Sequence, residues 1–317
     1  MIDLLNLEPN KVSKDLKNYI IGMYGNSGAG KTTTASKFGN SLIIGTELGF
    51  KTLPGVYAQP ALDWISFLTI INQLKKQEVK DKFDTIIIDT IGALTKHAEK
   101  FVLDRFGAKD LNDSQALPYG KGHTELEKMF YNAFTSIQKE GYGIVIVGHE
   151  KSVVDKETEE QFMDINIANK RIKQYIVSML DVLMYVEKTR DPAEPNIVYF
   201  KTTEKAEAKS RFPNIVPKIE FNYENVEKAI LDSVGDDAIE GIIEYREENE
   251  DFSKEEFEEL ARYCEEKGKA IIAKDESKFN DVVQTIERTL GKKIGEATLR
   301  DVPLLRILKD ELDQIDK

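Results

Sequence analysis

The sequence predicts an α/β domain with a mostly parallel sheet and crossover helices, followed by a smaller, acidic helical region. Three observations support this prediction. Short apolar runs alternate with helix-like stretches over the first two-thirds of the chain, several of these runs are continuous in Ile and Val, and the last third shows helical periodicity throughout. Strands that are covered on both faces have continuous apolar runs, and alternation of strands with helices is typical of parallel sheets.

The elements of the first two-thirds follow in chain order. The expected strands are Tyr19–Tyr24, Ser41–Gly45, Phe83–Asp89, Gly143–Gly148 and Asp181–Val186. The spacing of apolar residues predicts helices over Thr32–Phe38, Leu62–Lys76, Leu94–Arg105, Thr124–Lys139 and Asn169–Met179. We expect Asn196–Phe200 and Lys209–Glu220, the latter punctuated by Pro213 and Pro217, to form a further strand or hairpin that closes the sheet.

The last third carries the whole charge imbalance of the chain. The net charge is −12, and the residues after Phe221 include 27 acidic and 15 basic side chains, so residues 1–221 are neutral. A shift of this size in composition predicts a domain boundary, with a nucleotide-binding domain over 1–221 and an acidic helical domain over 222–317. A neutral first domain excludes a uniformly basic nucleic-acid binder and leaves a local basic patch open.

The acidic region has clear helix signals. The expected helices are Asn225–Val234, Ala238–Glu248, Glu255–Lys267, Lys278–Leu290 and Val302–Ile315. Ser253 with Glu256 has the spacing of a capping box, and Pro303 suits a first helical turn. Gly268 and Gly291 are the expected stops.

Composition excludes several classes of protein. No run of about 18 apolar residues is present, so we expect no membrane span and no membrane partner. The first residues lack the basic start and apolar stretch of an export signal, which predicts a cytoplasmic protein. One cysteine and three histidines argue against a disulfide framework and a zinc site.

The strongest motif is a phosphate-binding loop. The segment GNSGAGKT fits G-x-x-x-x-G-K-T, and it lies between an expected strand and an expected helix, as the motif requires. Its glycines allow successive N–H groups to point at one phosphate. We expect ATP as the ligand, Lys31 on its β- and γ-phosphates, and the Thr32 hydroxyl on Mg²⁺. The expected nucleotide-binding residues are Gly25, Asn26, Ser27, Gly28, Ala29, Gly30, Lys31, Thr32 and Thr33.

Carboxylates follow two of the other strands. Asp89 ends the run FDTIIID, where it would complete the metal site with Thr32 or, alternatively, cap the next helix. Glu47 follows the second strand, where it would activate water for attack on the γ-phosphate or else be a surface residue. His149 follows the fourth strand, as a sensor of the γ-phosphate or an ordinary loop histidine.

Two cations are candidates for a charge clamp. Lys209 and Arg211 are two residues apart in AKSRF, so in a strand they would point to the same side. They could reach a γ-phosphate across a subunit boundary, or they could decorate an edge strand.

The combination of these motifs resembles the RecA-like ATPases. The shared order is GNSGAGKT, the second-strand Glu47, IIIDT and a polar sensor on the fourth strand, where recombinases usually carry glutamine and this chain has His149. TELGFKTL, YGKG, VGHEK and AKSR further resemble the phage nucleotide-binding proteins that include the Sak-type single-strand annealing ATPases. The resemblance covers roughly residues 15–220 and implies a RecA-like P-loop core.

The resemblance also implies function and partners. It implies a Mg²⁺-dependent ATPase, with Glu47 as catalytic base, that binds single-stranded DNA and promotes phage recombination or annealing as a homo-oligomer in a bacterial host. A single-strand binding protein or another replication protein is an expected further partner. The implied DNA-binding segment is roughly Lys151–Lys173, in which Lys170–Lys173 is the cluster of cations. The alternatives are a P-loop motor, helicase loader or packaging ATPase, or a nucleotide-switched assembly protein without turnover.

Overall fold

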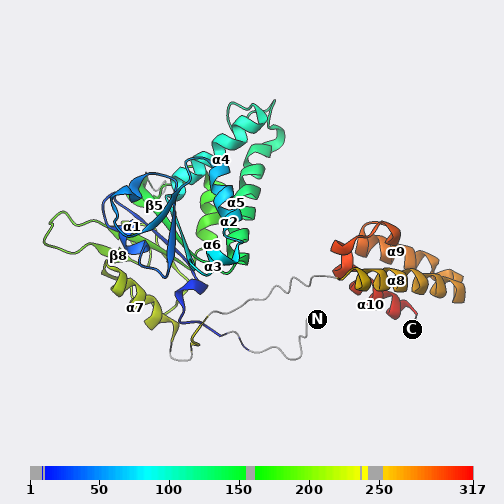
Figure 1. Cartoon of the computed structure of the whole chain (residues 1–317). Coiled ribbons are helices and arrows are strands. Elements are labelled where there is room, and N and C mark those ends of the chain that lie inside the picture. The colour runs from blue at the N-terminus through cyan, green and yellow to red at the C-terminus, as the bar shows by residue number, and fades with distance from the viewer. Residues whose placement is uncertain (1–8, 10, 155–160, 236–237, 242–252, 317) are drawn as a thin grey trace. The chain divides into compact units, whose positions relative to one another are not determined.

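The computed structural model describes residues 9, 11–154, 161–235, 238–241 and 253–316. The chain divides into two compact units, Met1–Glu244 and Tyr245–Lys317. Unit 1 contains a twisted sheet with helices on both faces, and unit 2 contains helices (Figure 1). The predicted fold class, a mostly parallel α/β core followed by a smaller helical region, is confirmed.

The sheet has the strand order β10-β8-β7-β1-β5-β4-β2-β3, with β6 added to β5 and β9 added to β7. Neighbours from β7 to β3 along this order run parallel, whereas β6, β8, β9 and β10 pair antiparallel. The strands are β1 Ile20–Gly25, β2 Ser41–Gly45, β3 Tyr57–Pro60, β4 Thr85–Asp89, β5 Gly143–Val154, β6 Gln161–Ile165, β7 Val182–Glu187, β8 Ile197–Tyr199, β9 Lys209–Ser210 and β10 Lys218–Glu220.

Both faces of the central strands are buried, which explains their continuous apolar runs. Ile86 and Ile88 of β4 pack beneath α2, α4, α5 and α6, while Ile87 packs in the opposite cluster with α1 and α7 (Figure 1). These helices are α1 Lys31–Ala35, α2 Trp64–Gln73, α3 Gln77–Lys80, α4 Ile91–Phe106, α5 Lys121–Lys139, α6 Lys170–Met179 and α7 Tyr223–Val234.

Three strands, β3, β5 and β6, depart from the sequence-based expectations, and β6 was not predicted. The strand β5 is longer than expected because its second half leaves the parallel sheet and forms an antiparallel hairpin with β6. The strand β3 was not predicted, because an exposed edge strand lacks the apolar run of the buried ones.

Helix α7 belongs to unit 1, although its sequence lies in the acidic last third. Val226 and Ile230 of α7 are fully buried in the cluster that covers the second face of the sheet. Tyr223, at the start of α7, packs edge-to-face on Phe38. The break between the units therefore falls after Glu244 and not after Phe221.

In its described residues, 253–316, unit 2 contains the α-helices α8 Lys254–Lys274, α9 Phe279–Leu290 and α10 Val302–Ile315, around a core that includes Cys264 and Leu308. Ser253 caps α8 as expected. Gly291 ends α9 with φ +65°. Gly268 does not end α8, because it lies inside the helix where it faces Val282 of α9.

The helix expected at Ala238–Glu248 lies mostly outside the described residues. Its described part, 238–241, is not helical, and Ile239 forms a bridge with Ser13. Among the helices that the structure describes, none combines the length and hydropathy needed to cross a bilayer.

The packing of α7 predicts where the chain can be cut. A chain that ends at Glu244 should melt at the same temperature as unit 1 of the full chain, whereas a chain that ends at Phe221 should melt at a lower temperature, because it loses Val226 and Ile230 from the core. In the full chain, Ile230→Ala should cost about 2–5 kcal/mol of unfolding free energy.

The matched control is Glu224→Ala on the exposed face of α7, where an ion pair with Lys37 is open to solvent and contributes little to stability. Scanning calorimetry measures each transition. Equal melting temperatures for the chains ending at Phe221 and Glu244 would show that α7 is dispensable for unit 1.

Candidate functional site

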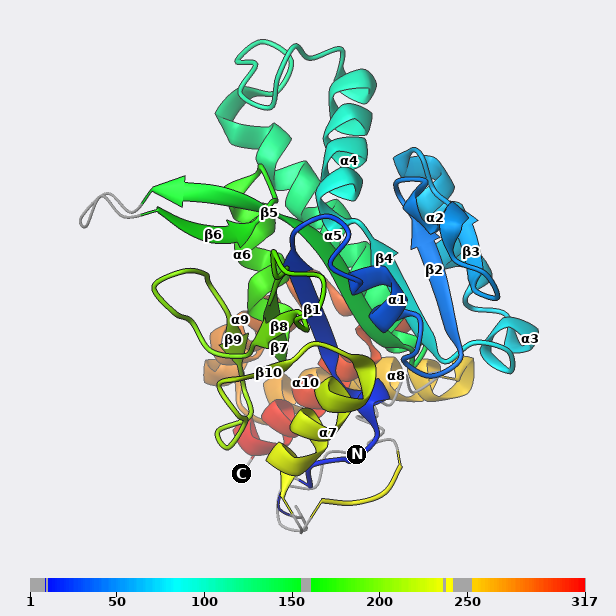
Figure 2. The ribbon, with the colours of Figure 1, turned by 90° about the vertical axis from the view of Figure 1, so that its left-hand side faces the viewer.

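The phosphate loop, residues 25–32, connects the carboxyl end of β1 to α1 in the middle of the sheet (Figure 2). In the register, Gly25 faces His149 of β5 on one side and Val186 of β7 on the other. A Cβ at Gly25 would collide with the carbonyl oxygen of Val186, so a glycine is required for this close approach. Gly28 and Gly30 have φ values of +74° and +87°, which let the loop turn back over itself.

Lys31 lies within the loop. Its side chain is 5% exposed, and its ammonium donates hydrogen bonds to the carbonyl oxygens of Gly25 at 2.9 Å and Asn26 at 2.6 Å. Burial lowers the pKa of Lys31, while the nearby carboxylates of Asp89 and Glu150 oppose that shift. The ammonium therefore sits at the loop without a direct carboxylate bond, where a phosphate could replace the two carbonyls as its partner.

Thr32 and Asp89 meet as the sequence suggested. The Thr32 hydroxyl donates to Asp89 Oδ2 at 2.8 Å, and Asp89 is almost fully buried at the end of β4. Burial raises the pKa of Asp89, and the hydrogen bond from Thr32 opposes the shift. The alternative role for Asp89, as the cap of α4, belongs instead to Thr90, whose hydroxyl accepts from the Ala93 amide.

The Thr32–Asp89 pair fits the requirements of Mg²⁺. The described residues contain no group of three or more His, Cys, Asp or Glu side chains that could hold a metal by themselves. Mg²⁺ usually keeps several waters and takes one or two protein oxygens together with phosphate oxygens. A hydroxyl and a carboxylate beside a phosphate loop are such a donor set.

Glu47 and His149 also come together at this end of the sheet. His149 Nε2 lies 3.3 Å from Glu47 Oε2, and the Thr90 hydroxyl donates to Glu47 Oε1 at 3.3 Å. Both Glu47 and His149 side chains are nearly half exposed, so water reaches the carboxylate. A carboxylate that is oriented from two sides and open to water has the geometry of a general base.

From sequence, Glu150 is only the second candidate for the general base, after Glu47, and the β7–β8 connection is not assigned to the site. The Asn26 amide of the phosphate loop donates to Glu150 Oε1, and Glu150 Oε2 is buried without a well-aligned donor among the described residues. Asn196, just before β8, donates to the Ala29 carbonyl at 3.2 Å. The β7–β8 connection could have been identified from its position in the fold. It follows β7, which runs parallel to β1, so it begins at the same edge of the sheet as the phosphate loop.

Lys209 and Arg211 lie elsewhere in the same chain. Lys209 pairs with Leu183 at the amino end of β7, the opposite end of the sheet from the phosphate loop. Its ammonium donates to three carbonyls at the end of α6, and Arg211 bonds the Ser178 carbonyl and the Asp181 carboxylate. Within one chain the two cations therefore stabilise the end of α6, and a role across a subunit boundary stays a prediction.

The cations of the expected DNA-binding segment are largely engaged. Lys173 forms ion pairs with Asp164 at 2.7 Å and Glu207 at 2.9 Å, and Arg171 lies 3.5 Å from Glu127. Lys151 donates to the Ile167 carbonyl, and Lys156 lies outside the described residues.

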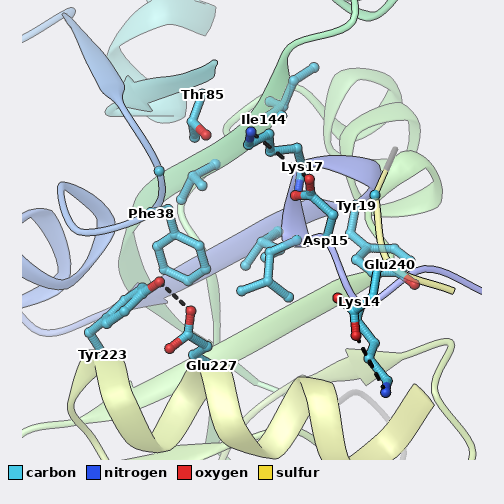
Figure 3. A pocket seen from close by; sticks show the side chains of 16 residues that line it. Lys14, Asp15, Lys17, Tyr19, Phe38, Thr85, Ile144, Tyr223, Glu227 and Glu240 are labelled. Carbon is cyan, nitrogen blue, oxygen red and sulfur yellow. Dashed lines mark hydrogen bonds and ion pairs between the residues drawn. The ribbon is translucent and has the colours of Figure 1, made fainter. Parts of the chain in front are cut away.

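A separate cavity of about 350 Å³ opens at the opposite end of the sheet, where β4 and β5 begin (Figure 3). Lys14 pairs with Glu240 and Lys17 with Asp15, while Glu227 accepts a hydrogen bond from the neutral Tyr223 hydroxyl (Figure 3). Each lysine of the lining is thus paired with a carboxylate, and the negative charge of Glu227 disfavours a phosphate here.

Three comparisons show what this chain is similar to. The SPbeta prophage-derived uncharacterized protein YorG of Bacillus subtilis strain 168 is 26% identical over 331 residues, which cover 99% of this chain and 98% of that protein. A crystal structure of the RadB recombinase covers 65% of this chain and 87% of its own, with 14% identity and a TM-score of 0.40. A family model described as an AAA domain matches residues 17–212, which include the whole candidate site, and the chain belongs to this family of AAA-type P-loop ATPase domains.

Proposed function

We propose that this protein is a Mg²⁺-dependent ATPase that binds single-stranded DNA and promotes phage DNA recombination or annealing as an oligomer. The observation that carries the ATPase part is the convergence of Lys31, the Thr32–Asp89 pair and the Glu47–His149 pair at one edge of the sheet. The prophage origin of the Bacillus subtilis relative supports a phage setting.

Each residue of the site has a separate role in ATP hydrolysis. Lys31 binds the β- and γ-phosphate oxygens, and Thr32 with Asp89 holds Mg²⁺, which supplies charge neutralisation on the phosphates. Glu47 accepts a proton from the attacking water. His149 and Thr90 hold the two carboxylate oxygens of Glu47, which keeps its orientation during the proton transfer.

The connection between α4 and α5 supports single-stranded DNA as partner. Tyr119 in this connection is fully exposed, with φ +57°, a conformation that a bulky side chain rarely adopts. Lys121 begins α5 two residues later, with its ammonium 4.6 Å from the centre of the Phe106 ring, and α4 and α5 carry this connection beyond the sheet (Figure 1). An exposed ring on which a base can stack is typical of proteins that bind single strands.

The overall proposal predicts nucleotide-dependent hydrolysis that responds to DNA. Wild-type protein with Mg²⁺ should release phosphate from ATP, faster with a single-stranded oligonucleotide, and Lys31→Ala should abolish nucleotide binding because it removes the ammonium from the loop. Lys37→Ala, on the surface just after α1, is the matched control. Phosphate release, titration calorimetry and light scattering measure rate, affinity and assembly.

Other experimental results would support one of the alternative functions. Strand unwinding or translocation would favour a motor, and tight ATP binding without turnover would favour a nucleotide-switched assembly protein. Normal ATP affinity of a folded Lys31→Ala variant would contradict the assignment of the phosphate loop.

Glu47→Gln should bind ATP normally and hydrolyse it about 10²–10⁴-fold more slowly, since the amide keeps the shape of the side chain and cannot take the proton. Single-turnover kinetics measure the chemical step directly. A rate within twofold of wild type would place the base elsewhere, with Glu150 as the next carboxylate to test.

Asp89→Asn should impair Mg²⁺-dependent ATP binding without lowering the stability of the fold. Because burial raises the pKa of Asp89, its ionised form opposes folding above the usual carboxyl range, so the neutral amide should leave the melting temperature unchanged or higher. The same variant should lose Mg²⁺-dependent ATP affinity. In the wild type, that affinity should fall on acidification at a higher pH than an ordinary aspartate would give. Unchanged Mg²⁺ dependence in Asp89→Asn would exclude Asp89 from the metal site.

A further inference from the structure

The connection from β7 to β8 runs directly beside the phosphate loop. Gly25 packs against the backbone of Val186, so the chain that follows Val186 must pass the loop at close range. Two residues later, the Lys188 ammonium lies 3.4 Å from the position that a Cβ of Gly28 would occupy.

Asn196 ties this connection to the loop. Its side-chain amide donates to the Ala29 carbonyl at 3.2 Å, and its Oδ1 accepts from the backbone amide of Thr189 at 3.0 Å and from the Thr189 hydroxyl at 3.2 Å. One side chain therefore fixes the residue next to Lys188 and, at the same time, a peptide of the phosphate loop.

The bond to Ala29 has a consequence for the loop. In a planar trans peptide, the carbonyl and the following N–H point in opposite directions. Because Asn196 holds the Ala29 carbonyl on the outside of the loop, the N–H of Gly30 is directed away from Asn196. Fixed N–H groups of this kind form the concave sites that bind anions in phosphate loops.

The charge of Lys188 is unmatched within the part of the chain that the structure describes. It has no acidic partner there, whereas Lys209 and Arg211 are satisfied by carbonyls and by Asp181. The Lys188 ammonium and the N–H groups of the loop both present positive charge. Their proximity is therefore favourable only when an anion is bound between them.

We propose that Lys188 binds the phosphate chain of a nucleoside di- or triphosphate from the β7 side, and that Asn196 is a positioning residue that orients the Ala29–Gly30 peptide toward the same phosphates. This inference rests on the proposed nucleotide-binding function of the loop. It assigns to the same chain a cation that the sequence motifs did not identify.

The test of Lys188 uses the full chain, with ADP and inorganic tripolyphosphate as probes in the presence of Mg²⁺. Lys188→Ala should weaken both ligands by about tenfold, as expected for loss of one hydrogen bond between charged groups. The matched control is Lys201→Ala, which removes an exposed lysine just after β8, away from the loop. Its affinities should stay within twofold of wild type.

Asn196→Ala tests the positioning role. Its ADP affinity, measured at a temperature where both proteins are fully folded, should fall by about tenfold, whereas loss of a merely structural contact would lower only the melting temperature. Lys188→Ala and Asn196→Ala variants that bind ADP as tightly as the wild type would overturn the inference. Failure of the wild type to bind any nucleotide would instead overturn the proposed function.

Discussion

The approach of the Gly25 backbone to Val186 is the constraint on which the candidate site depends. It brings β1 and β7 so close at their carboxyl ends that no side chain fits between them. The phosphate loop must therefore turn within the space that β5 and β7 leave, and the second half of β5 and the segment that follows β7 lie against it. Glu150, within the second half of β5, and Asn196, after β7, each bond the loop for this reason.

Burial sets the electrostatics of the site. Lys31 and Asp89 are both removed from water, and burial disfavours the charged form of each, as their opposite pKa shifts show. Each group is held in place by hydrogen bonds with neutral partners, carbonyls for Lys31 and a hydroxyl for Asp89. Hydrogen bonds with neutral groups stabilise the buried charges of Lys31 and Asp89 only in part. A ligand with negative charge would stabilise the ammonium of Lys31, and a metal ion bound with it would stabilise the carboxylate of Asp89.

The acidity of the last third is unevenly spread along the chain. A small part belongs to α7, which covers the sheet of unit 1 and presents acidic residues such as Glu224 to solvent. Most of it belongs to the stretch 235–252, which has eight acidic residues and one arginine, whereas residues 253–317 are nearly balanced, and there Asp313 and Asp316 pair with Lys267. The position at which net charge changes along the sequence therefore differs from the position at which the two packed units divide. Surface charge affects solubility, whereas the apolar faces of the helices hold a packed unit together.

The sequence by itself determined the central strands β1, β2, β4, β5 and β7, the phosphate loop and the Thr32–Asp89 pair. It also placed Glu47 and His149 at the carboxyl ends of parallel strands, which meet at one edge of the sheet. Tertiary structure decided the rest. Spacing predicted that Lys209 and Arg211 would share a side if both lay in a strand, but β9 ends at Ser210. Spacing also could not show at which end of the sheet they lie, since antiparallel pairing with β7 sets that. Lys188 carries no motif, and its place beside the loop follows from the register of β7 against β1, a long-range pairing that local sequence does not encode.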